Sequence, residues 1–420
     1  MKKLIPLVFV AIFIFLRLWS GSPWSFDNLT RNISDTFVQE SLEPSESFEY
    51  QEYIEGIEGD TELDESENPA EEAEEPVLLP EHQFGHPDHI DEIIAQMTLR
   101  EKVGQLFVVR MPDMLRAQSL IEDYHIGGFV LFSSDVSSIY QVQQLISDLQ
   151  ENSAIPLFIA VDEEGGRVSR IGRLFEERIP SPYAIGSTGD PQQAYDAYYL
   201  IGQRLALLGF NMNFAPVADI WTNPSNTVIG DRAFGTEPDV VADMVEAAIQ
   251  GLQSAGILSV IKHFPGHGDT LEDSHYNMAF FHHDKERFEQ IESLPFRRGI
   301  EAGADGIMLG HIAALDLIPE EHHIATFSRY IIEEVLRQSW GFNRLVITDA
   351  LDMRGLTHYF SHEDIIIASF LAGSDILLMP QNPEEAINTL INAYETGSID
   401  PALFHSRLNE SLRRILSVKF

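Results

Sequence analysis

Eight short apolar runs, separated by stretches with helical spacing, restrict the fold of the chain between Phe84 and Phe420 more than any other feature. Each run is almost continuously apolar, which is typical of parallel strands buried on both faces. Eight alternating β and α units predict an α/β protein with a TIM (β/α)8 barrel. A doubly wound open sheet is the main alternative, but its glycine-rich dinucleotide fingerprint does not follow the first run. The runs are Leu106–Val109, Gly128–Phe132, Leu157–Val161, Met212–Val217, Leu258–Ile261, Gly306–Leu309, Leu345–Ile347 and Ile376–Met379.

Polar side chains come directly after five of the eight runs. They are Asp162, Asp219, Lys262 with His263, His311 and Asp349. In a parallel barrel the carboxyl ends of all strands meet on one face, and enzymes with this fold carry their active sites there. The sequence therefore predicts a functional site built from these residues.

The first 83 residues have a different composition. Lys2 and Lys3 precede an apolar run from Leu4 to Leu16, which predicts a signal peptide or an uncleaved membrane anchor over residues 1–20. Basic residues stay in the cytoplasm, so we expect the rest of the chain to be extracellular, either secreted or anchored to the membrane. Residues 27–81 hold 19 acidic residues and one basic residue, which predicts a disordered acidic linker over residues 21–83. An acidic interaction tail is the alternative. Residues 84–420 are the predicted catalytic barrel.

Composition excludes several classes of site. The chain has no cysteine, so disulfides, thiolate metal sites and cysteine nucleophiles are excluded. Its net charge is −39, and it has no basic patch of the kind that nucleic-acid binding needs.

Six motifs occur in the order that is typical of glycoside hydrolase family 3. The stretch KHFPGHGDTLEDSH, residues 262–275, resembles the signature of the β-N-acetylhexosaminidase branch of this family. TDALDM at residues 348–353 resembles the segment that carries the nucleophile. The other four are MTLREKVGQL (97–106), VDEEGGRVSR (161–170), NFAPVADI (213–220) and GDRAFG (230–235). The motifs span most of the region from Phe84 to Phe420, and the family's fold agrees with the predicted barrel.

The resemblance implies a role for each matching residue. Asp349 corresponds to the nucleophile, His275 to the acid/base and Asp273 to the hydrogen-bond partner of His275. Residues two apart in an extended segment point the same way, so we expect Asp273 to contact the His275 ring. The flanking glycines Gly266 and Gly268 suggest a mobile loop. The alternatives are that Asp349 caps the next helix and that the histidines and aspartates of the loop bind a metal ion. The residues implied in substrate binding are Asp162, Arg170, Arg232, Lys262 and His263.

These expectations describe a retaining exo-β-N-acetylglucosaminidase that removes terminal β-GlcNAc from peptidoglycan fragments or related glycans. A GlcNAc phosphorylase or a β-glucosidase of the same family is the alternative enzyme, and a non-catalytic cell-wall-binding module is the alternative of a different class. We expect a small carbohydrate as substrate and no cofactor or metal. We also expect a monomer that touches the membrane only through its N-terminal segment.

Overall fold

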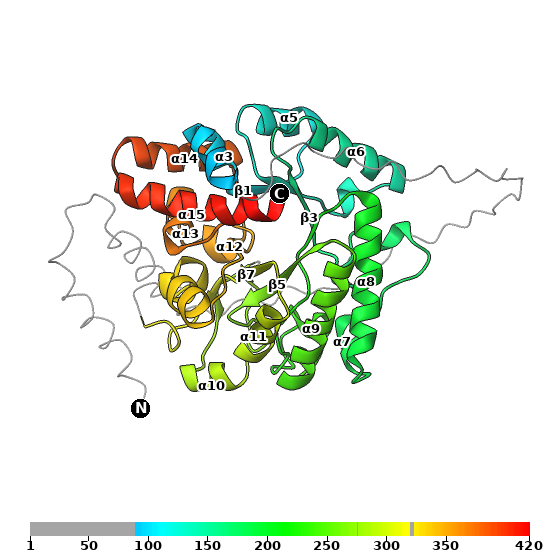
Figure 1. Ribbon diagram of the computed structural model, residues 1–420. Helices are drawn as coiled ribbons and strands as arrows, with labels where there is room; N and C mark the ends of the chain where they lie inside the picture. The colour runs from blue at the N-terminus through cyan, green and yellow to red at the C-terminus, as the bar shows by residue number, and fades with distance from the viewer. Residues whose placement is uncertain (1–88, 275, 320–322) are drawn as a thin grey trace, which may run out of the picture.

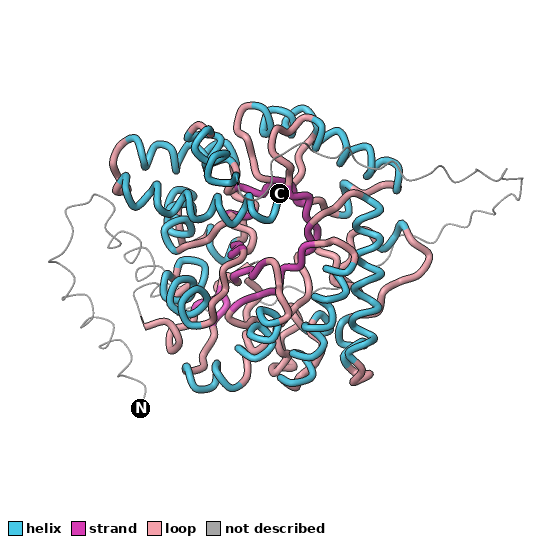
Figure 2. Tube along the Cα trace, in the orientation of Figure 1, coloured by secondary structure: helices cyan, strands magenta, loops and turns pink. Residues whose placement is uncertain are grey.

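The computed structural model describes residues 89–274, 276–319 and 323–420, and these form a barrel of eight parallel strands surrounded by helices (Figures 1 and 2). The strand order is β10-β1-β2-β3-β4-β5-β7-β9, and a parallel bridge between Ile347 and Ile376 joins β9 to β10. The barrel is therefore nearly closed, and it fits the predicted (β/α)8 fold rather than an open doubly wound sheet. The strands are β1 (Phe107–Arg110), β2 (Gly128–Val130), β3 (Phe158–Val161), β4 (Met212–Asn213), β5 (Leu258–Phe264), β7 (Gly306–Leu309), β9 (Leu345–Thr348) and β10 (Leu377–Leu378).

All eight strands fall within the apolar runs or overlap them. Their side chains are buried almost throughout, because the barrel interior covers one face and the helices cover the other. The prediction of eight parallel strands is confirmed. The predicted anchor and linker at residues 1–83 lie outside the described residues. Within the described part of the chain, no helix is both long enough and apolar enough to cross a bilayer.

Helices cover the outside of the barrel, and local sequence signals set their ends. Thr98 caps α4 in a capping box with Glu101. Helix α8 starts at Pro191 after the cap Asp190 and ends at Gly209, whose φ of 92° suits glycine. The helices are α3 (Ile90–Gln96), α4 (Leu99–Gly104), α5 (Met114–Glu122), α6 (Ile139–Glu151), α7 (Pro182–Gly186), α8 (Pro191–Leu208), α9 (Pro238–Ser254), α10 (Lys285–Gln290), α11 (Ser293–Glu301), α12 (Arg354–Thr357), α13 (His362–Ala372), α14 (Pro383–Glu395) and α15 (Pro401–Lys419). Shorter segments are the 3-10 helices η2 (Ser133–Asp135), η3 (Gly172–Leu174), η4 (Gly230–Arg232) and η5 (Ala325–Phe327), and the π-helix η6 (Tyr330–Ser339).

The amino ends of the strands are closed by the C-terminal helix. In Figures 1 and 2, α15 carries the C-terminus over the ring of strands. The Nζ atom of Lys419 donates to the carbonyl of Gly127 at 2.8 Å and to Oε1 of Gln105 at 2.9 Å. Helix α3 packs against α15 through an ion pair of Asp91 with Arg413. The first described helix and the last one therefore lie at the same end of the barrel.

A buried aspartate strengthens the seam between β9 and β10 at that end. Asp375 is fully buried and accepts a hydrogen bond from the backbone N–H of Val346 at 3.0 Å. Its carboxylate also contacts the guanidinium groups of Arg337, Arg407 and Arg414 at 2.6, 3.3 and 3.0 Å. Two of these arginines come from α15, so the C-terminal helix helps to hold the seam.

A second, two-stranded sheet lies outside the barrel. Its strands are β6 (Ala279–Phe280) and β8 (Ile312–Ala313), which pair in parallel. They follow β5 and β7 respectively, so the sheet extends the wall above the carboxyl ends of those strands.

Candidate active site

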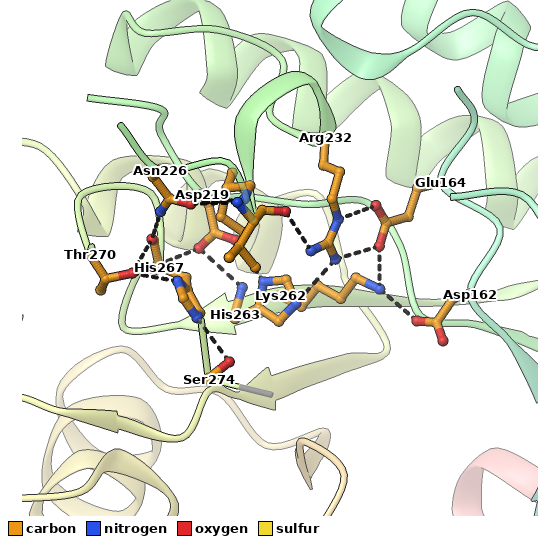
Figure 3. Close-up of polar contacts among 12 residues, drawn as sticks. Asp162, Glu164, Asp219, Asn226, Arg232, Lys262, His263, His267, Thr270 and Ser274 are labelled. Atoms are coloured by element: carbon orange, nitrogen blue, oxygen red, sulfur yellow. Dashed lines mark hydrogen bonds and ion pairs between the residues drawn. The ribbon is translucent and has the colours of Figure 1, made fainter. Parts of the chain in front are cut away.

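Lys262 is the centre of a buried polar network at the carboxyl ends of β3 and β5 (Figure 3). Its Nζ atom lies 2.7 Å from Oδ1 of Asp162 and 2.6 Å from Oε1 of Glu164. Burial alone lowers the pKa of Lys262, but the charges of Asp162 and Glu164 outweigh it and raise the pKa overall. Lys262 therefore stays a cation inside the protein.

Glu164 joins Lys262 to a second cation. The Nε and Nη2 atoms of Arg232, in η4, each donate to one Glu164 oxygen at 2.8 Å, which makes a bidentate pair. The Glu164 side chain is fully buried. Burial by itself raises its pKa, but Arg232 and Lys262 together hold the pKa well below its usual range.

Glu164 is a site residue that was not predicted. It belongs to the motif at residues 161–170, but a buried acid and a solvated one look alike in a single sequence. One signal in the sequence could have pointed to Glu164. Lys262 and Arg232 were both predicted at the site, and two buried cations need a buried anion, which the acidic segment after β3 can supply.

His263 is held in place by Asp219. Its Nδ1 atom lies 2.7 Å from Oδ2 of Asp219, and its Nε2 atom lies 3.4 Å from Nη2 of Arg232. Asp219 lies in the segment that follows β4, and its side chain is fully buried. Its other oxygen accepts the backbone N–H of His267 at 2.7 Å. One carboxylate thus orients the His263 ring and fixes the start of the loop that follows β5.

His267 is a neutral member of this network. Burial, and after it the charge of His263, lowers its pKa to about 4. Its ring nitrogens contact hydroxyl groups on the same loop, with Nδ1 at 2.6 Å from Thr270 Oγ1 and Nε2 at 3.0 Å from Ser274 Oγ. These contacts brace the segment that leads to Asp273.

The loop over residues 265–274 is anchored at Asp269. Its carboxylate accepts from the Thr222 hydroxyl at 2.6 Å and lies 2.5 Å from Nε2 of His283. The side chain of His283 is 25% exposed. Gly268 is required here by close approach, because a Cβ atom at this position would meet the Ile220 carbonyl oxygen at 1.8 Å.

Around Asp273 the backbone turns. The carbonyl of Asp273 accepts the N–H groups of Tyr276 and Asn277, both at 2.9 Å. The expectation of an extended segment is therefore wrong, because these bonds belong to a turn. His275, the predicted acid/base, lies outside the described residues, so its geometry with Asp273 stays a prediction.

Asp349 follows β9 on the same face as Lys262. Its backbone N–H donates to the carbonyl of Leu309 at 2.9 Å, and its Oδ1 atom accepts the N–H of Ala350 at 2.7 Å. The alternative role as a helix cap is wrong, because α12 starts at Arg354 and Met353 is in the cap position. The charge of Asp349 acts on His267, which places the carboxylate within electrostatic range of the network. His311 is fully buried and contacts the carbonyl of Ala350 at 2.8 Å through Nε2.

The structure thus brings four predicted binding residues into one network of side-chain contacts, and the fifth has a different side-chain contact. Asp162, Arg232, Lys262 and His263 form one connected network, whereas Arg170 packs over the ring of Phe132. A hollow of about 310 Å³ lies beside the loop over residues 265–274, and its lining includes Asp269, Leu271 and Glu272 but no predicted binding residue. Among the described residues, no group of three or more His, Asp or Glu side chains is arranged to hold a metal ion.

This arrangement suits a ligand with many hydroxyl groups. Charged donors and acceptors are fixed by one another before any ligand arrives, so little side-chain entropy is lost when they bind. Asp349 adds a carboxylate that could act as nucleophile or charge stabiliser.

Known proteins are similar to this chain in sequence and in fold. The model of the glycosyl hydrolase family 3 N-terminal domain matches residues 98–418. A beta-hexosaminidase A of Pseudoalteromonas piscicida is 37% identical over 327 residues, which cover 71% of this chain and 54% of that protein. The beta-hexosaminidase LpqI of Mycobacterium tuberculosis is 32% identical over 335 residues, which cover 78% of this chain and 84% of that protein.

Solved structures give the same result. A glycoside hydrolase family 3 beta-N-acetylglucosaminidase of a Paenibacillus species has a TM-score of 0.72 at 36% identity, covering 77% of this chain and 62% of that one. The beta-glucoside phosphorylase BglX also has a TM-score of 0.72, at 25% identity, and the match covers 79% of this chain and 60% of that one. The chain therefore spans less than two thirds of the Pseudoalteromonas, Paenibacillus and BglX proteins.

Proposed function

The chain belongs to glycosyl hydrolase family 3, and from this premise we propose that it is a retaining exo-β-N-acetylglucosaminidase. Its substrates would be peptidoglycan fragments or related glycans that end in β-GlcNAc. The observation that carries the proposal is the preformed network of Asp162, Glu164, Arg232 and Lys262 beside Asp349, in a chain whose relatives include proteins named beta-hexosaminidase.

In the proposed first step, the Asp349 carboxylate attacks the anomeric carbon and forms a glycosyl ester. The bond to the leaving oxygen breaks, and His275 gives that oxygen a proton. In the second step, water attacks the anomeric carbon and loses its proton to His275, while the carboxylate of Asp349 leaves. One bond forms and one breaks in each step, and both partners return to their starting protonation.

The described residues would hold the sugar during both steps. Lys262 and Arg232 are cations that donate to hydroxyl oxygens, and Asp162 is a carboxylate that accepts from hydroxyl groups. The side chain of Asp162 is 23% exposed, whereas that of Lys262 is 2% exposed, so Asp162 offers the network's accessible oxygens. Asp219 keeps the His263 ring in a fixed orientation toward the same site.

The proposal is tested with nitrophenyl glycosides and two aspartate variants. We expect the purified chain to hydrolyse nitrophenyl β-GlcNAc much faster than nitrophenyl β-glucoside. Asp349→Ala should lower kcat by at least about 10³-fold, because nucleophile loss removes the covalent route. Asp352→Ala, three residues away, is the matched control and should keep wild-type turnover. Equal turnover by Asp349→Ala and the wild type, or a preference for the glucoside, would contradict the proposal.

Phosphorolysis is a second candidate reaction, because the chain resembles the beta-glucoside phosphorylase BglX at a TM-score of 0.72. A histidine acid/base repels an incoming phosphate less than a glutamate would. Adding inorganic phosphate separates the two reactions, since only phosphorolysis yields GlcNAc-1-phosphate.

We also propose that the protein acts outside the cytoplasm as a monomer, with residues 1–20 as signal peptide or anchor. Lys2, Lys3 and the apolar run after them support this proposal. Cell fractionation tests it, because recovery of the protein in the cytoplasmic fraction would exclude export.

A further inference from the structure

Three arginines surround one loop on the face that carries the candidate site. Arg110 ends β1, and Arg170 and Arg173 lie in the segment after β3. The loop they surround runs from Phe132 to Val136, directly after β2. Strands β1, β2 and β3 are neighbours in the barrel, so the three side chains come from adjacent strand ends.

The ring of Phe132 organises two of these cations. The guanidinium carbon of Arg110 lies 4.9 Å from the ring centroid, and that of Arg170 lies 5.6 Å from it. Arg173 holds the loop itself, since its Nη2 atom donates to the carbonyls of Ser133 and Val136. A guanidinium stacked on a ring keeps its N–H edges available for a planar anion.

In the part of the chain that the structure describes, neither Arg110 nor Arg170 forms an ion pair, although the whole chain carries a net charge of −39. Two other arginines of the barrel, Arg116 and Arg413, pair with Glu384 and Asp91 respectively. The Nε atom of Arg170 is buried and has no hydrogen-bond partner among the described residues.

Glu163, whose charge interacts with that of Arg170, forms no ion pair with it. Glu163 is within electrostatic range of Arg170, but burial raises the pKa of Glu163 above its usual value. Its oxygens already accept from the hydroxyl of Ser169 at 2.5 Å and from the backbone N–H groups of Arg170 and Ile171 at 2.6 and 3.0 Å. The hydrogen bonds of Glu163 are therefore made to Ser169 and to backbone N–H groups, and not to the guanidinium group of Arg110 or Arg170.

We propose that Arg110 and Arg170 form a subsite for an anionic substituent of the glycan, with Phe132 as their support. The substituent is a carboxylate or a sulfate or phosphate ester, which share the planar or forked oxygens that guanidinium groups bind. The subsite is linked to the sugar-binding network through Glu163, which stands between Asp162 and Glu164 in sequence and accepts the backbone N–H of Arg170 at 2.6 Å. This inference rests on the proposed glycosidase function.

The test compares charged and neutral substrates of otherwise equal structure. One pair is methylumbelliferyl 6-sulfo-β-GlcNAc and methylumbelliferyl β-GlcNAc, and the other is GlcNAc-β-1,4-MurNAc and its methyl ester. The measured quantity is the ratio of kcat/KM for the anionic member to that for the neutral member. In Arg110→Gln we expect this ratio to fall about tenfold, which corresponds to roughly 1.4 kcal/mol, for whichever pair carries the recognised anion.

Arg413→Gln is the matched control, because it removes the same charge at the opposite end of the barrel. We expect it to leave both ratios at their wild-type values, and raising the salt concentration should reduce the wild-type ratio but hardly that of Arg110→Gln. A change in the sulfated pair alone assigns the anion to the terminal sugar, and a change in the muramyl pair alone assigns it to the leaving group. If Arg110→Gln and Arg413→Gln give equal ratios for both pairs, the subsite does not exist.

Failure of the proposed function gives a different result. If the wild type cleaves neither neutral substrate, the glycosidase proposal fails. The subsite is then tested by measuring the equilibrium binding of anionic and neutral sugars. Titration calorimetry of GlcNAc 6-sulfate and of MurNAc, each against GlcNAc, measures the affinity gain from the anion without turnover. A gain in the wild type that Arg110→Gln loses supports the subsite, and the same gain in both proteins overturns it.

Discussion

Replacing Glu164 by glutamine should destabilise the protein because it removes the buried carboxylate that two buried cations, Arg232 and Lys262, share. The Glu164 side chain is fully buried and pairs with Arg232 at 2.8 Å and with Lys262 at 2.6 Å. Removing one member of a buried ion pair costs about 3–5 kcal/mol, because the remaining charge stays desolvated. Glutamine keeps the volume and one acceptor, so we expect a loss of about 3 kcal/mol.

Urea unfolding followed by circular dichroism measures this loss. With a slope of about 3 kcal/mol per molar urea, the midpoint should fall by about 1 M. Glu177→Gln is the matched control, because Glu177 pairs with Arg204 at 3.3 Å but its side chain is 71% exposed. An exposed pair contributes less than about 1 kcal/mol, so the control midpoint should barely move.

A second substitution and a pH series make the reasoning refutable. Arg232→Met should offset part of the loss in Glu164→Gln, because it removes the buried cation that loses its ion pair, whereas Lys262 keeps its pair with Asp162. The double variant should therefore be more stable than additivity predicts. The pKa of Glu164 is lowered by folding, so its contribution is complete above the unfolded pKa near 4.3 and declines as the pH falls below it. The stability gap between wild type and variant should therefore narrow in acid. Equal midpoints for Glu164→Gln and Glu177→Gln, or strictly additive losses in the double variant, would refute the account.

Two further predictions concern other buried groups. The pKa of His267 is about 4 in the folded protein and about 6.5 in the unfolded chain, so the unfolded chain takes up the proton first as the pH falls. Lowering the pH from 6.5 to 4 should therefore cost the wild type up to about 3 kcal/mol of unfolding free energy. His267→Gln should lose less over that range, and parallel pH profiles of the two proteins in urea titrations would exclude a neutral buried His267. Asp375→Asn should cost about 3–5 kcal/mol, because three guanidinium groups would then surround a neutral amide. Thermal unfolding measures that cost. The KM for nitrophenyl β-GlcNAc should stay unchanged, because Asp375 lies at the amino ends of the strands. A raised KM with unchanged stability would contradict a purely structural role for Asp375.

The barrel could be predicted from sequence because its strands are buried on both faces and read as continuous apolar runs. The strand-end rule also predicted which polar residues would meet, and Asp162, Lys262 and His263 do meet. Glu164 could not be predicted in this way, because only the fold shows that its carboxylate points inward between two cations. The turn at Asp273 escaped for a similar reason, since Asp, Ser and Asn suit both turns and extended loops.

The packing of α3 on α15 decides from which side the folded domain can be held. Both helices lie at the amino ends of the strands, and the candidate site opens at the carboxyl ends. A support attached through the residues that precede α3 would therefore lie at the amino ends of the strands and leave the candidate site at the carboxyl ends uncovered. Attachment through the C-terminus is less suitable, because Lys419 is bonded to Gln105 and Gly127 and would have to be pulled away from the strands. Surface display or immobilisation of this enzyme should accordingly use the N-terminal side.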